Sequence, residues 1–141
     1  MLWYSGMRIS EAVNIKASDF NWEEGTVIVL GKGNRYRKCL AGNGLIRQWF
    51  SKHDTFEVTK GGAQTMLKRL KAEADVQCNA HSFRRGFCIH QLKNGLSTRI
   101  VQALGGWDTI SMVENYSKSL GFDEALNLYR QINGLNKLTT D

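Results

Sequence analysis

The only convincing signal for β-structure in this sequence lies in its first third. Thr26–Leu30 is short and rich in β-branched residues, Gly31–Asn34 supplies turn residues, and Arg35–Leu40 alternates in polarity. This pattern predicts a hairpin that presents Lys32 between two glycines at its tip, and a short third strand near residues 18–21 could pair with it. The other segments have helical periodicity. The sequence therefore predicts an α+β fold, mainly helical, with a small antiparallel sheet.

Apolar residues recur at helical spacing through most of the remaining chain. The first residues form one apolar turn that ends at Gly6, which can adopt the left-handed conformation that terminates helices. Of the later helices, one should direct Met66, Leu67 and Leu70 inward, and Ser82 should be the N-cap of the next. The expected helices span residues 8–16, 45–52, 63–74, 82–93, 96–104, 109–118 and 122–132.

Composition limits the class of protein. The chain has 141 residues, which suits a single domain with a substantial core, and the polar tail at residues 135–141 should fray. A net charge of +6 and a pI near 9.4 favour a polyanionic partner. No apolar run is long enough to span a membrane and the chain lacks the basic start of a signal peptide, so we expect an intracellular protein. Neither a metal nor a cofactor is expected, because the three cysteines follow no metal or redox spacing: Cys39, Cys78 and Cys88.

Several residues with catalytic potential stand out. His81 and Arg84 are three residues apart, so they share one face of a helix near its N-terminus, where free N–H groups favour an anion. Each candidate also has an ordinary interpretation. Arg8 could be a solvated surface arginine, Lys32 part of a solubilising basic turn, and Tyr116 a tyrosine at the edge of the core. Their combination in one chain is what suggests a site.

Together these residue types permit a tyrosine hydroxyl to attack a phosphodiester without a metal. Two arginines can grip the non-bridging oxygens in planar, charge-assisted hydrogen bonds. A lysine on a hairpin, such as Lys32, can give a proton to the leaving 5′ oxygen. A phenol is a weak nucleophile at neutral pH, so Tyr116 needs nearby cations and a base such as His81 before it can form a covalent intermediate.

The whole chain resembles the catalytic domain of the tyrosine recombinases, the phage integrase family. Gly6–Glu11 is similar to the family's first arginine motif, Leu30–Asn34 to its lysine hairpin, and His81–Arg84 to its His-x-x-Arg motif. Leu104–Trp107 fits the position held by His or Trp in different members, and Tyr116, nine residues after the Trp, falls at the position of the nucleophile. Each motif alone is weak, but their order and spacing together are specific.

The resemblance implies site-specific DNA strand exchange through a 3′-phosphotyrosine intermediate, with double-stranded DNA as the partner and no cofactor. It also implies self-association on DNA through the last helix, residues 122–132, and a cytoplasmic protein encoded by a prokaryote or a phage. Glu11 would orient the site, and DNA contacts are expected from Arg35, Arg37, Lys38 and Arg85. The catalytic residues would be Arg8, Lys32, His81, Arg84, Trp107 and Tyr116, the last as nucleophile.

The sequence also departs from the family. Arg85 and Gly86 stand where a His and a Thr often follow the second arginine, and Trp107 offers one N–H in place of an imidazole. We expect residues 1–141 to form a single catalytic domain that lacks the family's first catalytic-domain helices and its N-terminal core-binding domain. Two other interpretations stay open: a DNA-binding remnant that no longer cuts, and a basic helical interaction module whose motif matches are chance.

Overall fold

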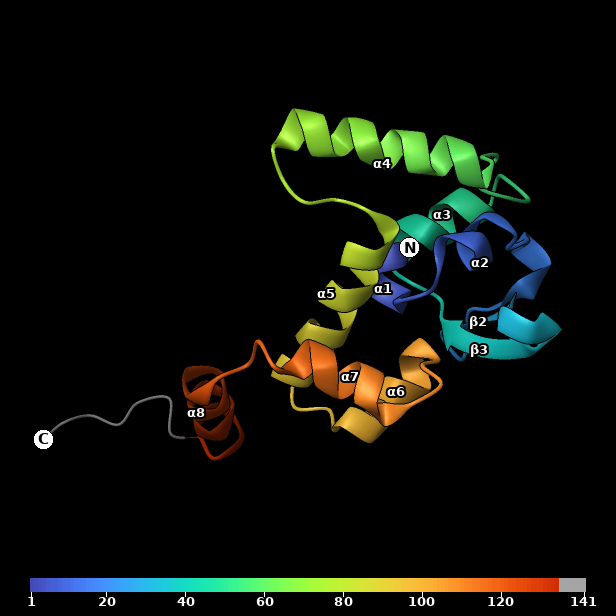
Figure 1. Ribbon diagram of the computed structural model, residues 1–141. Helices are drawn as coiled ribbons and strands as arrows, with labels where there is room; N and C mark the ends of the chain where they lie inside the picture. Colours follow the sequence, from blue (N-terminus) through green and yellow to red (C-terminus); the bar gives the residue numbers. More distant parts are fainter. Residues whose placement is uncertain (135–141) are drawn as a thin grey trace, which may run out of the picture.

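The predicted hairpin forms, with a third strand beside it. The computed structural model describes residues 1–134, and its sheet has the antiparallel order β1-β2-β3: β1 Phe20–Asn21, β2 Thr26–Leu30 and β3 Tyr36–Leu40 (Figure 1). The turn between β2 and β3 is a short 3-10 segment, Lys32–Asn34, in which Gly33 has a φ of 71°. The prediction that residues 135–141 fray lies outside the described residues.

The register of the sheet divides its side chains between the core and the solvent. Val27 pairs with Cys39 and Val29 pairs with Arg37, and both valines and the cysteine are buried. Because side chains alternate along a strand, Arg37 extends from the same face of β3 as Cys39. Lys38 lies between them on the outer face, where it is exposed and forms an ion pair with Glu24 at 3.1 Å.

The N-terminal segment turns sharply before the second helix. Helix α1 (Leu2–Ser5) ends at Gly6, whose φ is 65°, and α2 (Ile9–Val13) follows. The predicted helix over residues 8–16 was too long. The chain leaves the helix at Asn14, whose side chain donates to the Ser10 carbonyl at 2.8 Å, and the backbone N–H of Lys16 donates to Asp19 instead.

Two helices lie above the sheet and α2 (Figure 1). They are α3 (Gly44–Phe50) and α4 (Lys60–Ala74), and α4 packs on α2 through the buried residues Ala63 and Leu67. The prediction that Met66 and Leu70 also face inward was wrong, because they are 58% and 44% exposed. In the described part of the chain α4 meets α2 along a narrow strip, and Met66 lines an open groove beside that strip.

The long central helix is α5 (Ala80–Lys93), which contacts α1 on one side and α6 and α7 on the other. It begins two residues before the predicted N-cap. Asn79 is the cap, because its Oδ1 accepts hydrogen bonds from both the backbone N–H and the hydroxyl of Ser82, at 2.8 and 3.0 Å. Phe87 and Cys88 of α5 are fully buried.

The last three helices complete the lower half of the molecule (Figure 1). They are α6 (Thr98–Gly105), α7 (Ile110–Ser117) and α8 (Phe122–Ile132). Val101 of α6 and Val113 of α7 are fully buried against Phe87. Helix α8 lies at the edge, where Leu128 approaches Gly95 at the end of α5. None of the helices within residues 1–134 is long and apolar enough to span a membrane.

Candidate active site

Arg84 is the most firmly held of the candidate residues. Its side chain comes from the first turns of α5 and is only 6% exposed. One guanidinium nitrogen, Nη1, donates to the main-chain carbonyls of Gly6 at 2.6 Å and Gly105 at 2.7 Å. The guanidinium carbon also lies 4.2 Å from the centre of the Trp107 ring, a cation–π contact. The corner after α1 and the corner after α6 thus fix one arginine between them.

The other terminal nitrogen of the Arg84 guanidinium, Nη2, differs from Nη1. Nη2 is buried and has no hydrogen-bond partner among the residues that the structure describes. Burial, together with the charges of Arg8 and Arg37, lowers the pKa of Arg84 to about 10, so the side chain is still a cation at neutral pH. A buried N–H on a cation without an acceptor is costly, and an anionic ligand would supply that acceptor.

Glu11 connects two more arginines to this cluster. Its carboxylate is 2% exposed and accepts hydrogen bonds from Arg37 Nε at 2.9 Å and Arg37 Nη2 at 3.0 Å. It also accepts from the backbone N–H of Arg8 at 2.7 Å, while the Arg8 Nη1 atom is 3.8 Å away. Burial raises the pKa of Glu11, but the hydrogen bonds from Arg37 and Arg8 and their charges outweigh burial and hold it below its ordinary value.

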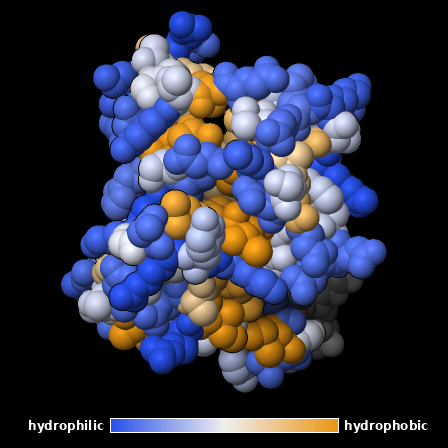
Figure 2. Space-filling view, turned by 90° about the vertical axis from the view of Figure 1, so that its right-hand side faces the viewer, coloured by the Kyte–Doolittle hydropathy of each residue, from blue (hydrophilic) through white to orange (hydrophobic). Residues whose placement is uncertain are grey.

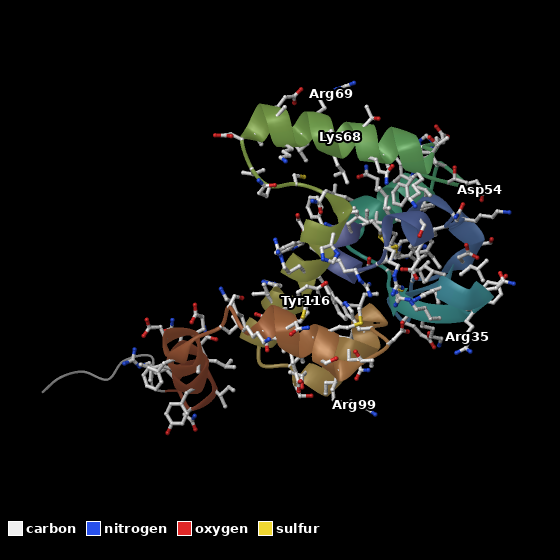
Figure 3. All side chains as sticks on the ribbon, in the orientation of Figure 1. Arg35, Asp54, Lys68, Arg69, Arg99 and Tyr116 are labelled. Carbon is white, nitrogen blue, oxygen red and sulfur yellow. The ribbon has the colours of Figure 1, made fainter. Side chains whose placement is uncertain are left out.

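Tyr116 and His81 meet at the side of Arg84. The Tyr116 hydroxyl lies 3.2 Å from His81 Nε2, and the Tyr116 ring packs edge-on against the Trp107 ring with centroids 6.0 Å apart. Figure 3 shows Tyr116 where α7 meets α5. His81 is exposed and Tyr116 half-buried, so the hydroxyl can be reached from solvent. Trp107 contacts both Arg84 and Tyr116 and sets the spacing between them.

Two glycines allow this close packing. A Cβ atom on Gly105 would stand 1.9 Å from the Trp107 ring, and one on Gly106 would stand 2.6 Å from the guanidinium carbon of Arg37. Gly106 also has a φ of 66°, in the left-handed region that ends α6. In the Leu104–Trp107 motif the two glycines, which have no side chain, are therefore as important as the Trp107 indole.

Lys32 is presented differently. It is exposed at the tip of the β2–β3 hairpin, beside a cavity of about 400 Å³ that Arg8 and Glu11 also line. Lys32 thus borders the same recess as Arg8, but from a turn at the surface.

The four residues expected to contact DNA do not form one group. Arg35, Lys38 and Arg85 are exposed, and Figure 3 shows Arg35 at the hairpin, away from Tyr116. Arg37 instead lies against Glu11 with a side chain that is only 19% exposed. The strand alternation, with Arg37 on the face of Cys39, was the sequence signal for its inward position.

Sequence reasoning also missed two groups that carry no side-chain chemistry. The carbonyls of Gly6 and Gly105 hold Arg84. Every residue has a carbonyl, so no sequence motif predicts which carbonyls bind the arginine. The structure thus forms two adjoining groups of contacts. Glu11 joins Arg8 and Arg37, and Trp107 joins Arg84 and Tyr116, with His81 beside Tyr116. The groups meet where Arg37 lies against Gly106, next to the Gly105 carbonyl that binds Arg84, and Lys32 lies at the rim of the first group.

Comparison with known proteins shows the family of the chain. A family model described as the phage integrase family matches residues 1–121. The chain belongs to the phage integrase family. Within this family, a curated relative is the tyrosine recombinase XerC of Proteus mirabilis, 28% identical over 92% of this chain and 48% of the relative. The chain therefore spans about half the length of that integrase-family relative.

Solved structures show the same fold. The XerA recombinase has a TM-score of 0.73 at 23% identity, covering 92% of this chain and 54% of that chain. The XerH site-specific recombinase bound to palindromic difH substrate, a post-cleavage complex, has a TM-score of 0.68 at 23% identity, over 92% of this chain and 44% of that chain. The mainly helical fold with a small antiparallel sheet, predicted from the sequence, is confirmed, and it is shared with these two recombinases.

Proposed function

We propose that this chain is the catalytic unit of a site-specific DNA recombinase, which cuts and rejoins DNA strands through a 3′-phosphotyrosine at Tyr116. The observation that carries the proposal is the Tyr116 hydroxyl 3.2 Å from His81 Nε2, beside a buried arginine whose Nη2 lacks an acceptor within residues 1–134. A nucleophile, a base and a cation in need of an anion form the minimum set for attack on a phosphodiester.

Arg84 and Arg8 would hold the non-bridging oxygens. Arg84 is fixed before substrate arrives, because its Nη1 is bound to two carbonyls, and its Nη2 has no acceptor among the described residues and is the proposed donor to a phosphate oxygen. Arg8 is about one-third exposed, with its side chain at 30%, so its guanidinium can reach a ligand in the recess. Fixed donors aimed at developing negative charge usually contribute more to catalysis of this kind than any other single effect.

The bond changes in the proposed step balance. The Tyr116 oxygen bonds to phosphorus while the bond from phosphorus to the 5′ oxygen breaks. The hydroxyl proton passes to His81, and Lys32 donates a proton to the departing 5′ oxygen. A 5′ hydroxyl from a second duplex then reverses these steps, so the energy of the cut bond is kept in the phosphotyrosine and no nucleotide cofactor is consumed.

Double-stranded DNA is the proposed partner. A net charge of +6 and the exposed cations Arg35, Lys38 and Arg85 suit a phosphate backbone. The XerH recombinase of similar fold is bound to its difH substrate. These contacts would act without regard to base sequence, so the target must be selected by other contacts.

We also propose that α8 docks on a second copy of the chain when both are on DNA. Its apolar residues have little cover within the described chain: Phe122 is 77% exposed, Tyr129 57% and Ile132 70%. Figure 2 shows the opposite side of the molecule, away from α8, where hydrophobic side chains also reach the surface between hydrophilic ones. A helix with this much exposed apolar surface gains stability by burial in a partner. Ile132→Glu should leave the free protein monomeric and folded but weaken cooperative DNA binding. Unchanged cooperativity in a gel-shift titration would argue against α8 as the contact.

The experiment that tests the function uses a pool of nicked duplexes with randomised sequence. After cleavage, the short fragment that carries the new 5′ hydroxyl dissociates, so the strands cannot be rejoined and the covalent complex accumulates. We expect denaturant-resistant adducts, whose DNA can be sequenced to give the target. Tyr116→Phe should remove the adduct, and Tyr4→Phe, at an exposed tyrosine of α1, should not. DNA binding by the wild-type chain without any adduct would contradict the enzyme and favour a DNA-binding remnant.

A further inference from the structure

Arg37 binds Glu11 more tightly than Arg8 does. Two parallel hydrogen bonds of 2.9 and 3.0 Å join the Arg37 guanidinium to both carboxylate oxygens, whereas the Arg8 Nη1 atom is 3.8 Å away. Glu11 therefore has a partner from a strand that is distant in sequence, and the neighbouring arginine of its own corner is only loosely paired. This division of partners matters because Glu11 is almost fully buried.

A buried carboxylate must be neutralised by some cation. If Arg37 were absent, Arg8 would be the cation best placed to take its role, since its backbone N–H already binds Glu11 at 2.7 Å. A close ion pair would draw the Arg8 guanidinium out of the recess that it shares with Lys32. A phosphate would then lose one of its two proposed arginine contacts.

We propose that Arg37 is a positioning residue of the active site, which occupies both oxygens of Glu11 so that Glu11 orients the Arg8 backbone without capturing the Arg8 guanidinium. The role of Arg8 toward phosphate rests on the proposed function, but the coupling of the three side chains does not. In this role Arg37 acts through Glu11, and its own Nη1 is, like Arg84 Nη2, buried without a hydrogen-bond partner among the described residues.

Arg37 also joins the hairpin to the loop that holds Arg84. Its guanidinium lies against Gly106, where no side chain could be accommodated, next to the Gly105 carbonyl that accepts from Arg84. Arg37 pairs with Val29 of β2, the strand that leads into the Lys32 turn. One guanidinium thus connects the corner of Arg8, the lysine hairpin and the Arg84 loop.

The charges around Glu11 come from four elements. Arg8 begins α2, Arg37 and Cys39 lie on β3, Arg84 lies on α5, and Lys32 borders the same cavity from the hairpin turn. Burial raises the pKa of Cys39 to about 11, so the thiol is neutral near pH 7. The Arg84 Nη1 atom is bonded to two carbonyls. Arg37 and Arg8 are therefore the two cations that compete for the carboxylate.

The test compares Arg37→Met with Arg99→Met, at an exposed arginine of α6 that is not among the proposed DNA contacts, and with the double variant Glu11→Gln/Arg37→Met. Cleavage of saturating suicide duplex is measured at pH 7.5. Arg37→Met should slow cleavage at least tenfold, because Arg8 then pairs with Glu11 and no longer with the phosphate. The double variant should cleave faster than Arg37→Met, and Arg99→Met should match the wild type.

A second readout does not depend on catalysis. Carboxyl ¹³C NMR titration of the free protein, with the Glu11 signal identified by its loss in Glu11→Gln, should give a clearly higher midpoint in Arg37→Met than in the wild type. The midpoint in Arg99→Met should be unchanged. Arg37→Lys keeps the charge but cannot form both hydrogen bonds to Glu11, so its Glu11 midpoint should lie between those of the wild type and Arg37→Met. Arg37→Lys replaces Arg37→Met in the test if Arg37→Met does not fold.

Two results would overturn the proposal. One is a Glu11 midpoint that is the same in Arg37→Met, or in Arg37→Lys, as in the wild type. The other is a double variant no faster than Arg37→Met, which would reduce Arg37 to a structural residue. If the wild-type chain forms no adduct, the proposed function fails, while the NMR titration still decides whether Arg37 holds Glu11.

Discussion

Arg84 and Lys32 would act on the same phosphate, yet the chain holds them in opposite ways. Arg84 is 6% exposed, bonded to two carbonyls and packed on the Trp107 ring. Lys32 is exposed at a hairpin tip, next to Gly33 with its left-handed backbone. A group that stabilises developing charge works best when fixed in advance, whereas a group that delivers a proton must follow the leaving oxygen.

The glycines of the two regions express the same difference. Gly105 and Gly106 are required because aromatic and guanidinium groups fill the space where a Cβ would stand. Gly33 is required for its φ of 71°, and a Cβ there would meet nothing within 4 Å. Glycine near Arg84 serves tight packing, while glycine near Lys32 serves a turn in open solvent.

The largest effect should come from Arg84→Ala. We expect cleavage to fall by about a thousandfold or more, the order lost with a preorganised donor to the transition state. Stability should also fall, by about 1–3 kcal/mol for each buried carbonyl left without its donor. Arg99→Ala, at an exposed arginine of α6 outside the proposed DNA contacts, should change neither strongly. Adduct assays and thermal denaturation measure both quantities, and an active, equally stable Arg84→Ala would break the contrast between the two regions.

Lys32→Ala should lower activity and leave stability unchanged. A lost general acid typically slows a reaction by about 10²- to 10⁴-fold. A duplex with a 5′-bridging phosphorothiolate at the scissile position needs no proton on its leaving group, so it should restore cleavage by Lys32→Ala but not by Arg84→Ala. Equal rescue of both variants, or of neither, would remove Lys32 from its role as the acid.

Substitution of the glycines should separate packing from backbone conformation. Gly105→Ala places a methyl group 1.9 Å from the Trp107 ring, and such overpacking costs about 1–3 kcal/mol. It should also slow cleavage, because Trp107 contacts both Arg84 and Tyr116. Gly33→Ala should cost about 1–2 kcal/mol through its left-handed backbone alone. Urea denaturation gives both values, and a neutral Gly105→Ala would show that the indole can move aside.

The smallest effect concerns acid stability. The pKa of Glu11 is lower in the folded protein than in the unfolded chain, so its stabilising contribution is present above the unfolded pKa and is lost as pH falls through the folded pKa. Glu11→Gln should therefore flatten the decline of stability with acid. Glu24→Gln, at an exposed ion pair with Lys38, should flatten it less. Unfolding free energies measured between pH 2 and pH 6 test this, and the reverse order would contradict it.

Sequence patterns predicted much of this molecule and missed specific parts for physical reasons. Alternation and turn residues located the hairpin, and motif spacing gathered the candidate catalytic residues. The N-cap moved from Ser82 to Asn79 because both residues suit a cap and only the three-dimensional path selects one. Met66 and Leu70 follow helical periodicity but meet no covering element within the described residues, since periodicity reports a helix face and not its neighbour.

Other features depend on contacts between distant segments. Strand alternation places Arg37 on the face of Cys39, but its contact with Glu11 depends on how β3 meets α2. The role of the Gly6 and Gly105 carbonyls depends on two corners meeting around one arginine. Both are long-range consequences of packing. Residue types suggested the chemistry, while the bracing that holds those residues came from contacts between distant segments.

A crystal structure of the chain with cleaved duplex and orthovanadate would test the proposed mechanism most directly. Vanadate bound between the Tyr116 oxygen and a 5′ hydroxyl mimics the pentacoordinate phosphate. We predict that Arg84 keeps its bonds to the Gly6 and Gly105 carbonyls and donates Nη2 to vanadate, and that Lys32 moves from the hairpin tip to the 5′ oxygen. Vanadate bound away from Tyr116, or an Arg84 that must leave both carbonyls to reach it, would contradict this mechanism.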